Sequence, residues 1–240
     1  MIGSYAMPSA VLLNIRSIRR HCGYEVPILI ADDCSPGMAP TPDPASPYGR
    51  LVTIAHSEPN TTLWSSPERI GHAGGDMSAF WKGLQWAGSL KLDYLVKLSQ
   101  RFIVDQPDWC RKAAEELNAS GLATASRDCA WHQFPTRTEA VVMEVARWFK
   151  PAVLAHLTPR RINYAVEAVL MDTIRDHVQD PAIHFWSVMS PQRPHSSDLT
   201  VFREADGMRR YRKIADQVGV ELGEDFHVRD SNSTDDYRIG

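Results

Sequence analysis

The chain has 240 residues, of which 43% are hydrophobic and 23% are charged, so its composition is that of an ordinary globular protein with a substantial core. Its net charge of -3 argues against a protein that coats nucleic acid, and leaves only a local basic patch open. No apolar run approaches the ~20 residues that span a bilayer, and no secretory signal is visible, so we expect a cytoplasmic protein. The four cysteines form no CxxC pair, which predicts reduced thiols rather than structural zinc or a disulfide framework.

The first thirty residues predict one βαβ unit. Residues 1–4 are apolar enough for a strand, Pro8 is tolerated in the first turn of a helix, and Gly23 ends that helix. Residues 26–31 (VPILIA) form a continuous apolar run that is typical of a strand buried on both faces. Two strands joined by a helix on this scale are expected to lie parallel.

Strands and helices continue to alternate along the chain. Residues 37–48 are rich in proline and predict a loop, residues 51–55 (LVTIA) predict a third strand, and residues 57–71 predict another loop. We expect a helix from Gly74 to Gly88, a fourth strand at 94–98, a helix at 109–119 capped by Asp108, and a fifth strand at 122–125. The pattern predicts an α/β fold whose mostly parallel central sheet is flanked by helices.

Polar residues follow two of these strands directly. Asp32 and Asp33 follow the second strand, and Ser99, Gln100 and Arg101 follow the fourth. Ligands of open α/β sheets bind outside the carboxyl ends of the strands, so these residues mark either a binding site or plain strand exits.

In order, these features resemble the GT-A glycosyltransferases, especially the family-2-like branch. The resemblance rests on Ser4-Tyr5 after the first strand, the basic helix end NIRSIRRH, the acidic strand exit in PILIADDCSP, and the segment GHAGGDMSAFWKGLQWA before the fourth strand. It covers residues 1–105 well and is weaker beyond them. It implies a Rossmann-like GT-A fold, a nucleotide-sugar donor, foremost a UDP-sugar, and transfer to a hydroxyl group.

The candidate donor-binding residues lie at the strand exits and at the start of the third helix. A carboxylate can accept a hydrogen bond from a base or ribose, and glycines before a helix let the backbone approach a phosphate. The same motifs also fit an ordinary β-turn and an ordinary helix start. The candidates are Ser4, Tyr5, Asp32, Asp33, Gly75, Asp76, Lys97, Ser99 and Arg101.

The chain departs from the family pattern at the fourth strand. GT-A enzymes usually carry an Asp-x-Asp motif there for a divalent metal, whereas this chain has Ser99-Gln100-Arg101. This set is a poor match for Mg²⁺ or Mn²⁺, so a metal cofactor is not the favoured prediction. Arg101 can place a permanent positive charge beside the diphosphate instead. Lys97 either adds to the positive charge that faces the diphosphate or forms a buried ion pair. The alternative is a nucleotide-sugar binding module that has lost catalysis.

The second half is expected to hold the acceptor. Arg137 and Thr138 form a polar cluster suited to a sugar or a phosphate, or else a turn salt bridge, and Trp131 and His132 add rings that suit either a sugar or the core. Residues 139–149 fit a strand or a helix equally well.

A strong helical pattern at 160–178 carries the first candidates for a catalytic base. Glu167 is the first choice, Asp172 the second and Glu139 the third, because an inverting enzyme needs a carboxylate within reach of the acceptor hydroxyl. Glu167 also fits a solvated or capping role, and a retaining enzyme needs no such base.

The C-terminal part predicts a strand at 184–189 and a helix at 204–218 with a basic cluster, which suits an anionic acceptor, a membrane surface or a solvated helix face. We expect one domain over 1–230, with a donor half at 1–105, an acceptor half at 106–230 and a polar tail at 231–240.

The expected acceptor is a glycan or a hydroxymethylated DNA base such as 5-hydroxymethylcytosine, which must be exposed from the duplex. A nucleotidyltransferase is disfavoured because no Gly-rich basic signature follows the first strand. The basic cluster consists of Arg209, Arg210, Arg212 and Lys213.

Overall fold

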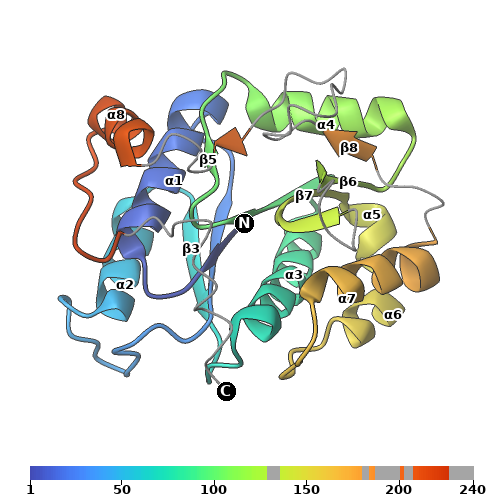
Figure 1. Ribbon diagram of the computed structural model, residues 1–240, viewed down its shortest axis with the longest axis horizontal. Helices are drawn as coiled ribbons and strands as arrows, with labels where there is room; N and C mark the ends of the chain where they lie inside the picture. The colour runs from blue at the N-terminus through green and yellow to red at the C-terminus, as the bar shows by residue number, and fades with distance from the viewer. Residues whose placement is uncertain (129–135, 180–183, 187–200, 203–207, 227–240) are drawn as a thin grey trace.

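The computed structural model describes residues 1–128, 136–179, 184–186, 201–202 and 208–226 (Figure 1). The predicted tail at 231–240 lies outside these residues. The strands are β1 (Ile2–Ser4), β2 (Ile28–Asp32), β3 (Thr61–Ser65), β4 (Tyr94–Ser99), β5 (Ile103–Val104), β6 (Thr124–Asp128), β7 (Thr136–Glu144), β8 (His184–Trp186) and β9 (Val201–Phe202). The helices are α1 (Pro8–Cys22), α2 (Pro47–Ser57), α3 (His72–Ser89), α4 (Trp109–Ser120), α5 (Val145–Trp148), α6 (Pro151–His156), α7 (Val166–Asp172), the π-helix η1 (Thr173–Val178) and α8 (Met208–Val218).

The described strands form a seven-stranded central sheet in the order β3-β2-β1-β4-β7-β6-β8, and β5 pairs with β9 in a small second sheet. Strands β3, β2, β1 and β4 run parallel, β7 runs antiparallel to both β4 and β6, and β8 runs parallel to β6. This confirms the predicted α/β fold with a mostly parallel sheet between helices.

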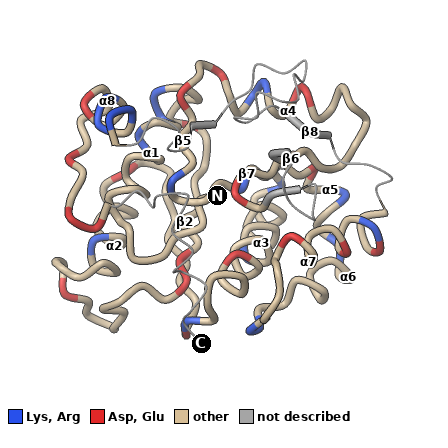
Figure 2. The backbone as a smooth tube through the Cα atoms, viewed as in Figure 1, with Lys and Arg blue, Asp and Glu red and all other residues tan. Residues whose placement is uncertain are grey.

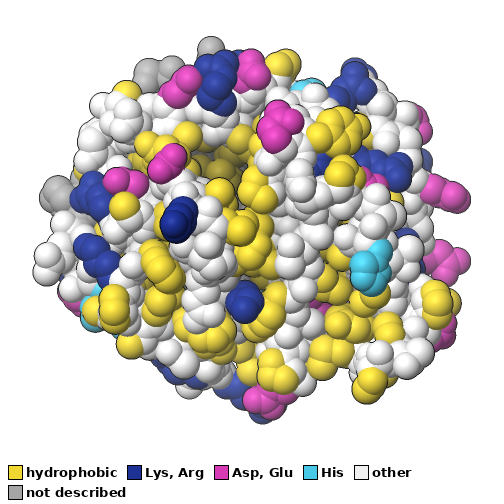
Figure 3. Space-filling view, turned by 180° about the vertical axis from the view of Figure 1, so that it is seen from behind, with side chains coloured by type: hydrophobic (Ala, Val, Ile, Leu, Met, Phe, Trp, Pro, Cys, Tyr) yellow, Lys and Arg dark blue, Asp and Glu magenta, His cyan; other side chains and the backbone are white. Residues whose placement is uncertain are grey.

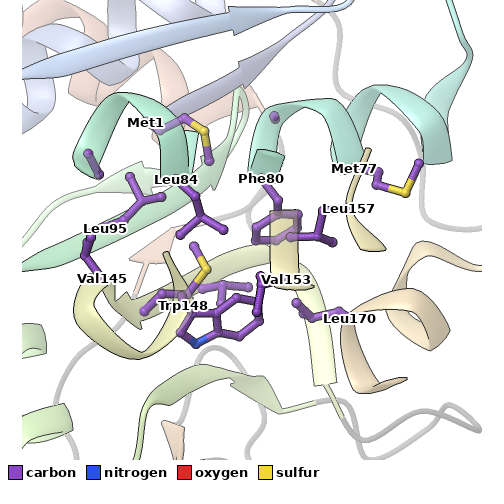
Figure 4. Packing of buried hydrophobic residues seen from close by; sticks show 14 of the residues in the cluster. Met1, Met77, Phe80, Leu84, Leu95, Val145, Trp148, Val153, Leu157 and Leu170 are labelled. Carbon is purple, nitrogen blue, oxygen red and sulfur yellow. The ribbon is translucent and has the colours of Figure 1, made fainter. Parts of the chain in front are cut away.

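Alternate residues of the strands face two different helical layers. Leu29 and Ala31 of β2 belong to the core on the side of α3, α5, α6 and α7, whereas Ile28 and Ile30 belong to the core on the side of α1, α2 and α4. Both faces of β2 are therefore buried, as its unbroken apolar sequence predicts. Figure 4 shows the first of these cores, in which Trp148 lies beside Val153. The Trp148 indole N–H donates to the Thr124 hydroxyl at 3.0 Å.

The strand predicted at 51–55 is wrong, and the loop predicted at 57–71 is wrong where it contains a strand. Residues 51–55 lie in α2, and the third strand, β3, is Thr61–Ser65 within the predicted loop. Ser46 caps α2 by accepting from the Gly49 N–H at 3.0 Å, with Pro47 at the first helical position. Leu51 and Ile54 are both buried at helical spacing, so tertiary burial overrides the β preference of Val52, Thr53 and Ile54.

Three other sequence predictions are corrected or decided. The helix predicted over 160–178 is shorter: α7 begins only at Val166, and the last turn, Thr173–Val178, is a π-helix. The strand reading of residues 139–144 is correct, because they lie in β7. Asp108 precedes α4 with φ 59° and makes no side-chain cap, so its predicted capping role is wrong.

Large apolar side chains on the surface come from separate segments, as is normal for a globular protein. On the face turned away from the viewer of Figure 1, apolar side chains are interspersed with a few Lys or Arg side chains, and the surface is hollowed near its middle (Figure 3). Over the described ranges, no helix combines the length and the apolarity needed to cross a membrane. The exposed large side chains are Tyr24, Met38, Leu90, Phe149 and Tyr164.

The segment after α8 ties the C-terminal part of the described chain to the start of α1. The Asp225 carboxylate accepts from the Ser9 N–H at 2.8 Å, from the Ser9 hydroxyl at 2.7 Å and from Arg50 at 2.8 Å. Asp225 thus supplies a cap to a helix 216 positions earlier, since Met7 makes no side-chain cap. Burial works against the charged carboxylate, but the hydrogen bonds from Ser9 and Arg50 outweigh it and lower the pKa of Asp225.

Replacing Asp225 with Asn should lower stability at neutral pH and matter little in acid. A lowered folded-state pKa contributes stability above the unfolded value of about 3.9, and this stability is lost as the pH falls through the folded value. Urea unfolding of Asp225→Asn and of the native chain should therefore differ at pH 7, and the difference should shrink as the pH falls through the lowered folded-state pKa of Asp225. Glu224→Gln, at an exposed neighbouring position, is the control and should not differ. An equal deficit at all pH values would contradict this role.

Candidate functional site

The carboxyl ends of β1 and β4 lie side by side at the place where the strand order reverses. The chain builds β1, β2 and β3 outward in one direction and then returns to place β4 on the other side of β1. Open α/β sheets bind ligands at such a switch point. The loops after β2 and β3 and the start of α3 meet at this lower edge of the ribbon (Figure 1). We call it the carboxyl edge.

Gln100 holds the two strands together beyond their last residues. Its backbone N–H donates to Gly3 O at 3.0 Å, its side-chain Oε1 accepts from the Tyr5 N–H at 3.0 Å, and its Nε2 donates to Tyr5 O at 3.1 Å. The side-chain amide of Gln100 thus forms with Tyr5 the pair of hydrogen bonds that the backbone of a neighbouring strand would form. Gln100 was not among the sequence candidates, because nothing in the sequence shows which backbone lies opposite it.

The two aspartates after β2 differ in role. Asp32 is buried and accepts from the Ser35 N–H and the Ser65 hydroxyl, both at 2.8 Å, and from the Ser35 hydroxyl. These bonds fix the turn after β2. The structural role in a β-turn, which the sequence left open as the alternative to donor binding, therefore applies to Asp32.

Asp33 carries the more perturbed carboxyl group. Burial raises its pKa to about 6, the nearby charges of Asp32 and Asp76 act in the same direction, and the Ile70 N–H and Arg69 oppose them. The Ile70 N–H donates to Asp33 Oδ1 at 3.3 Å, a long hydrogen bond. A carboxyl group with this pKa changes charge near neutral pH, which is typical of functional sites.

Arg69 is a cation at this edge that was not among the sequence candidates. Its guanidinium lies over the Tyr5 ring, 4.2 Å from the ring centroid, in a cation–π contact. The contact joins the loop after β3 to the exit of β1. Arg69 lies in an irregular segment with no motif around it, so the sequence offered no signal for it.

Lys97 is fully buried in the middle of the sheet. Its ammonium group donates to Asp76 Oδ1 at 2.7 Å, to Thr138 O at 2.7 Å and to Ser99 Oγ at 3.1 Å. The Thr138 hydroxyl donates to the other Asp76 oxygen at 3.1 Å. The buried ion pair that the sequence left open is therefore present, and it joins α3, β4 and β7. We call these four residues the Lys97 network.

The start of α3 points toward the carboxyl edge. Gly71 precedes the helix with φ 86° and no side-chain cap, so its conformation favours glycine. An ideal Cβ on Gly74 would lie 2.8 Å from Arg160 O, and one on Gly75 would lie 2.8 Å from the Asp33 carboxyl. Close packing against protein atoms thus explains the glycines at 74 and 75.

The residues after β4 do not fit a divalent metal ion. The Ser99 hydroxyl accepts from a Lys97 ammonium group, the Gln100 oxygen accepts from a backbone N–H, and Arg101 is itself a cation. Within the described ranges, no three or more His, Cys, Asp or Glu side chains are grouped to hold a metal. Hard cations such as Mg²⁺ and Mn²⁺ need several oxygen ligands.

Arg101 lies in the turn that follows β4 and is half-buried. The Tyr211 hydroxyl of α8 donates to its backbone oxygen at 2.8 Å, which fixes the turn from the other side. This bond does not involve the guanidinium group, so a substitution at position 101 leaves it in place.

The three candidate bases lie at different distances from this edge. Leu98 pairs with Ala140, so Glu139 of β7 lies at the level of the end of β4. Glu167 is half-buried in the first turn of α7. Arg160, six residues before that helix, has its backbone oxygen close to Gly74 at the start of α3. Asp172 is at the other end of α7 and forms an ion pair with Arg175 at 2.8 Å.

The predicted acceptor residues are only partly described. Thr138 is buried and belongs to the Lys97 network. Arg137 lies in β7, but its side chain is outside the described part, and so are Trp131 and His132 altogether.

A groove of ≈ 380 Å³ lined by Tyr94 and Glu144 lies at the start of β4, which is the opposite edge of the sheet, so it is not part of this site.

The fold is that of the GT-A glycosyltransferases. Over 88% of this chain it matches the mannosyltransferase PcManGT from Pyrobaculum calidifontis, solved with GDP-Man and Mn²⁺, at TM-score 0.53 and 12% identity. It matches S. aureus TarS in complex with UDP-GlcNAc over 93% of this chain at TM-score 0.51 and 11% identity. An active-site variant of LgtC matches over 90% of this chain and 94% of its own, at TM-score 0.55 and 7% identity. The chain spans 57% of the length of PcManGT and 67% of that of the TarS fragment.

These similarities establish the fold, and the sequence identities are too low to establish more. A scan against protein-family models finds no match, and a search of curated proteins finds none.

Breaking the Lys97 network should destabilise the protein strongly. Lys97→Met leaves the Asp76 carboxylate at a buried site without its cation, which typically costs about 3–5 kcal/mol. The double variant Lys97→Met/Asp76→Leu should cost less than the sum of the two single variants, as measured by urea unfolding. Lys112→Met on the exposed face of α4 should change stability by less than about 0.5 kcal/mol. Strictly additive costs would show that the two groups do not interact.

The carboxyl group of Asp33 should titrate with a midpoint of about 6, measured from its ¹³C chemical shift. A raised folded-state pKa contributes stability below the unfolded value of about 3.9, and this stability is lost as the pH rises through the folded value. The unfolding free energy of Asp33→Asn should therefore fall less between about pH 4 and pH 6 than that of the native chain. A midpoint below about 4.5 would refute the buried environment assigned to Asp33.

Proposed function

We propose that this protein is a glycosyltransferase that moves a sugar from a nucleoside-diphosphate sugar to a hydroxyl group without a divalent metal. The observation that carries the proposal is the end of β4 at the switch point of a GT-A fold, where an arginine stands and the donor set does not fit a metal. A diphosphate at this place needs positive charge, and a guanidinium supplies it through paired hydrogen bonds.

In this proposal the donor lies along the carboxyl edge. Asp33 and the exit of β1 with Ser4 and Tyr5 hold the nucleoside, and Arg101 with the start of α3 binds the diphosphate. Asp76, Lys97 and Ser99 act indirectly, because their polar groups bond one another and fix the shape of the edge. Asp32 anchors the turn that carries Asp33. A UDP-sugar is the first donor to test, and GDP-sugars are the second, in keeping with the ligands named for the TarS and PcManGT structures.

The transfer step needs a base and a stabilised leaving group. The acceptor hydroxyl gives its proton to a carboxylate, its oxygen bonds to the anomeric carbon, and the bond from that carbon to the diphosphate oxygen breaks. Arg101 counters the charge that develops on the departing diphosphate. We take Glu167 as the first choice of base and Glu139 as the next, because Glu167 lies in the first turn of α7 and Glu139 lies at the level of the end of β4. Residues 1–105 then form the donor half and residues 106–230 the acceptor half.

A basic groove on the side of α8 bears on the acceptor. The groove has a volume of ≈ 430 Å³ and is lined by the end of α1 and by α8, with Arg20, Arg209 and Lys213 among its residues. Figure 2 shows the Lys and Arg positions gathered on α8. One acidic residue of the lining, Asp105, is paired with Arg210. The groove lies where α1 ends, at the edge of the sheet opposite the carboxyl edge, so it can contact only the phosphates of a long polyanion whose reacting group lies elsewhere. On this charge, DNA that carries 5-hydroxymethylcytosine is proposed as an acceptor beside glycans.

Donor hydrolysis or transfer should survive EDTA, and Arg101→Ala should weaken donor binding. Loss of a charge-assisted hydrogen bond worth about 1.5–3 kcal/mol raises the Kd about 10- to 150-fold. Calorimetry with UDP- and GDP-sugars measures the Kd, and mass spectrometry of glycan and 5-hydroxymethylcytosine duplex acceptors measures transfer. Arg101→Lys should recover part of the affinity, and Arg111→Ala, an exposed arginine of α4, should bind like the native chain.

The competing function is a binding module without catalysis. Tight donor binding with no turnover on any acceptor would favour the module, and activity abolished by EDTA would refute the metal-independent proposal. An unchanged Kd for Arg101→Ala would remove the role given to that residue.

A further inference from the structure

Two cysteines far apart in the sequence lie in contact between α1 and α4. Cys22 is the last residue of α1, Cys110 is the second residue of α4, and 88 positions separate them. The Cys110 N–H donates to the Cys22 sulfur at 3.4 Å, and the two thiols are hydrogen-bonded to each other. Both residues are half-buried, and both carry free thiols.

The backbone holds the two elements in place around the sulfurs. The Asp108 N–H donates to His21 O at 2.7 Å, which joins the residue before α4 to the last turn of α1. A disulfide has an S–S distance of about 2.0 Å, so thiols already in hydrogen-bond contact need only a small approach.

The surroundings give the two sulfurs unequal reactivity. The hydrogen bond from Cys110 lowers the pKa of Cys22, the N–H groups of Cys110 and Trp109 add to this, and burial and Asp108 oppose it. The same thiol–thiol bond and burial raise the pKa of Cys110, against the attraction of the N-terminal amine and Arg19. Cys22 is thus suited to attack an oxidant and Cys110 to react second.

Cys34 offers a contrast within the same chain. Burial and the negative charges of Asp32, Asp33 and Glu68 raise the pKa of its thiol, and no second cysteine is described beside it. Cys34 is half-exposed, so its rate of oxidation shows how fast a cysteine of similar exposure reacts without a second thiol beside it.

We propose that Cys22 and Cys110 form a modification site at which hydrogen peroxide closes a reversible disulfide between α1 and α4. The Cys22 thiolate attacks one peroxide oxygen, the S–O bond forms, the O–O bond breaks, and hydroxide leaves and takes up a proton as water. The Cys110 sulfur then attacks the sulfenic sulfur of Cys22, the S–S bond forms, and the S–O oxygen leaves as water with the Cys110 proton. The two thiols lose two electrons and the peroxide gains them.

The site is separate from the proposed donor site. Helix α1 begins after the carboxyl end of β1 and ends at Cys22, shortly before β2 starts, so the thiol pair lies at the opposite edge of the sheet. The disulfide is therefore expected to change stability through the cross-link, independently of donor binding.

The test treats the full chain, in a Cys129→Ser background, with stoichiometric hydrogen peroxide. The expected product has lost about 2 Da, contains a Cys22–Cys110 cross-linked peptide on non-reducing mass mapping, and retains an alkylatable Cys34. Its thermal midpoint should rise and should return on treatment with dithiothreitol. Cys110→Ser should accumulate a sulfenic acid at Cys22 that dimedone traps, whereas Cys22→Ser should leave Cys110 as a thiol. The proposal is overturned if Cys34 oxidises as fast as Cys22, or if Cys22 reaches the sulfinic acid in the native chain without a cross-link to Cys110.

Discussion

A fully buried ammonium group sets the shape of the candidate site. Lys97 lies at the centre of the sheet, where an unpaired charge would be very costly, so its three hydrogen bonds must be satisfied from within the protein. Its partners come from α3, β4 and β7, and these elements meet at the boundary between the parallel and antiparallel parts of the sheet. The position of α3 and the exit of β4 are therefore coupled.

This coupling limits which polar groups can serve a ligand. Ser99 is engaged by Lys97, Gln100 by the Tyr5 backbone and Asp32 by its own turn. Several residues that look like ligands in the sequence thus build the edge of the sheet. Asp33 and Arg101, one at each of two strand exits, are the proposed contacts to a donor because of the raised pKa of Asp33 and the permanent charge of Arg101.

The order of elements could be predicted because it depends on local signals. The buried run of β2, the helix from Pro8 to Gly23 and the strand before Ser99 each have a clear apolar pattern and a clear stop. The exchange of strand and helix around residues 51–65 could not be predicted, because LVTIA favours a strand locally and packs as a helix only through the Ser46 cap and the burial of Leu51.

The strand exits that make up the candidate site could also be predicted, but not the contacts between them. A polar residue after an apolar run is visible in a sequence, so Asp32, Asp33 and Arg101 are expected at strand ends, where the structure has them. The Gln100 contact to Tyr5 and the Arg69 contact depend on which strands are neighbours, which only the topology shows. The contact of Cys22 with Cys110 across 88 positions is of the same kind.

The central claim is that a diphosphate binds at the end of β4 against an arginine rather than a metal. A crystal structure with UDP in the presence of Mn²⁺ tests it most directly. We expect the diphosphate between Arg101 and the start of α3, the uridine beside Asp33, and no metal ion bridging the phosphates. A Mn²⁺ ion held between the diphosphate and this chain, or UDP bound away from the carboxyl edge, would contradict the account.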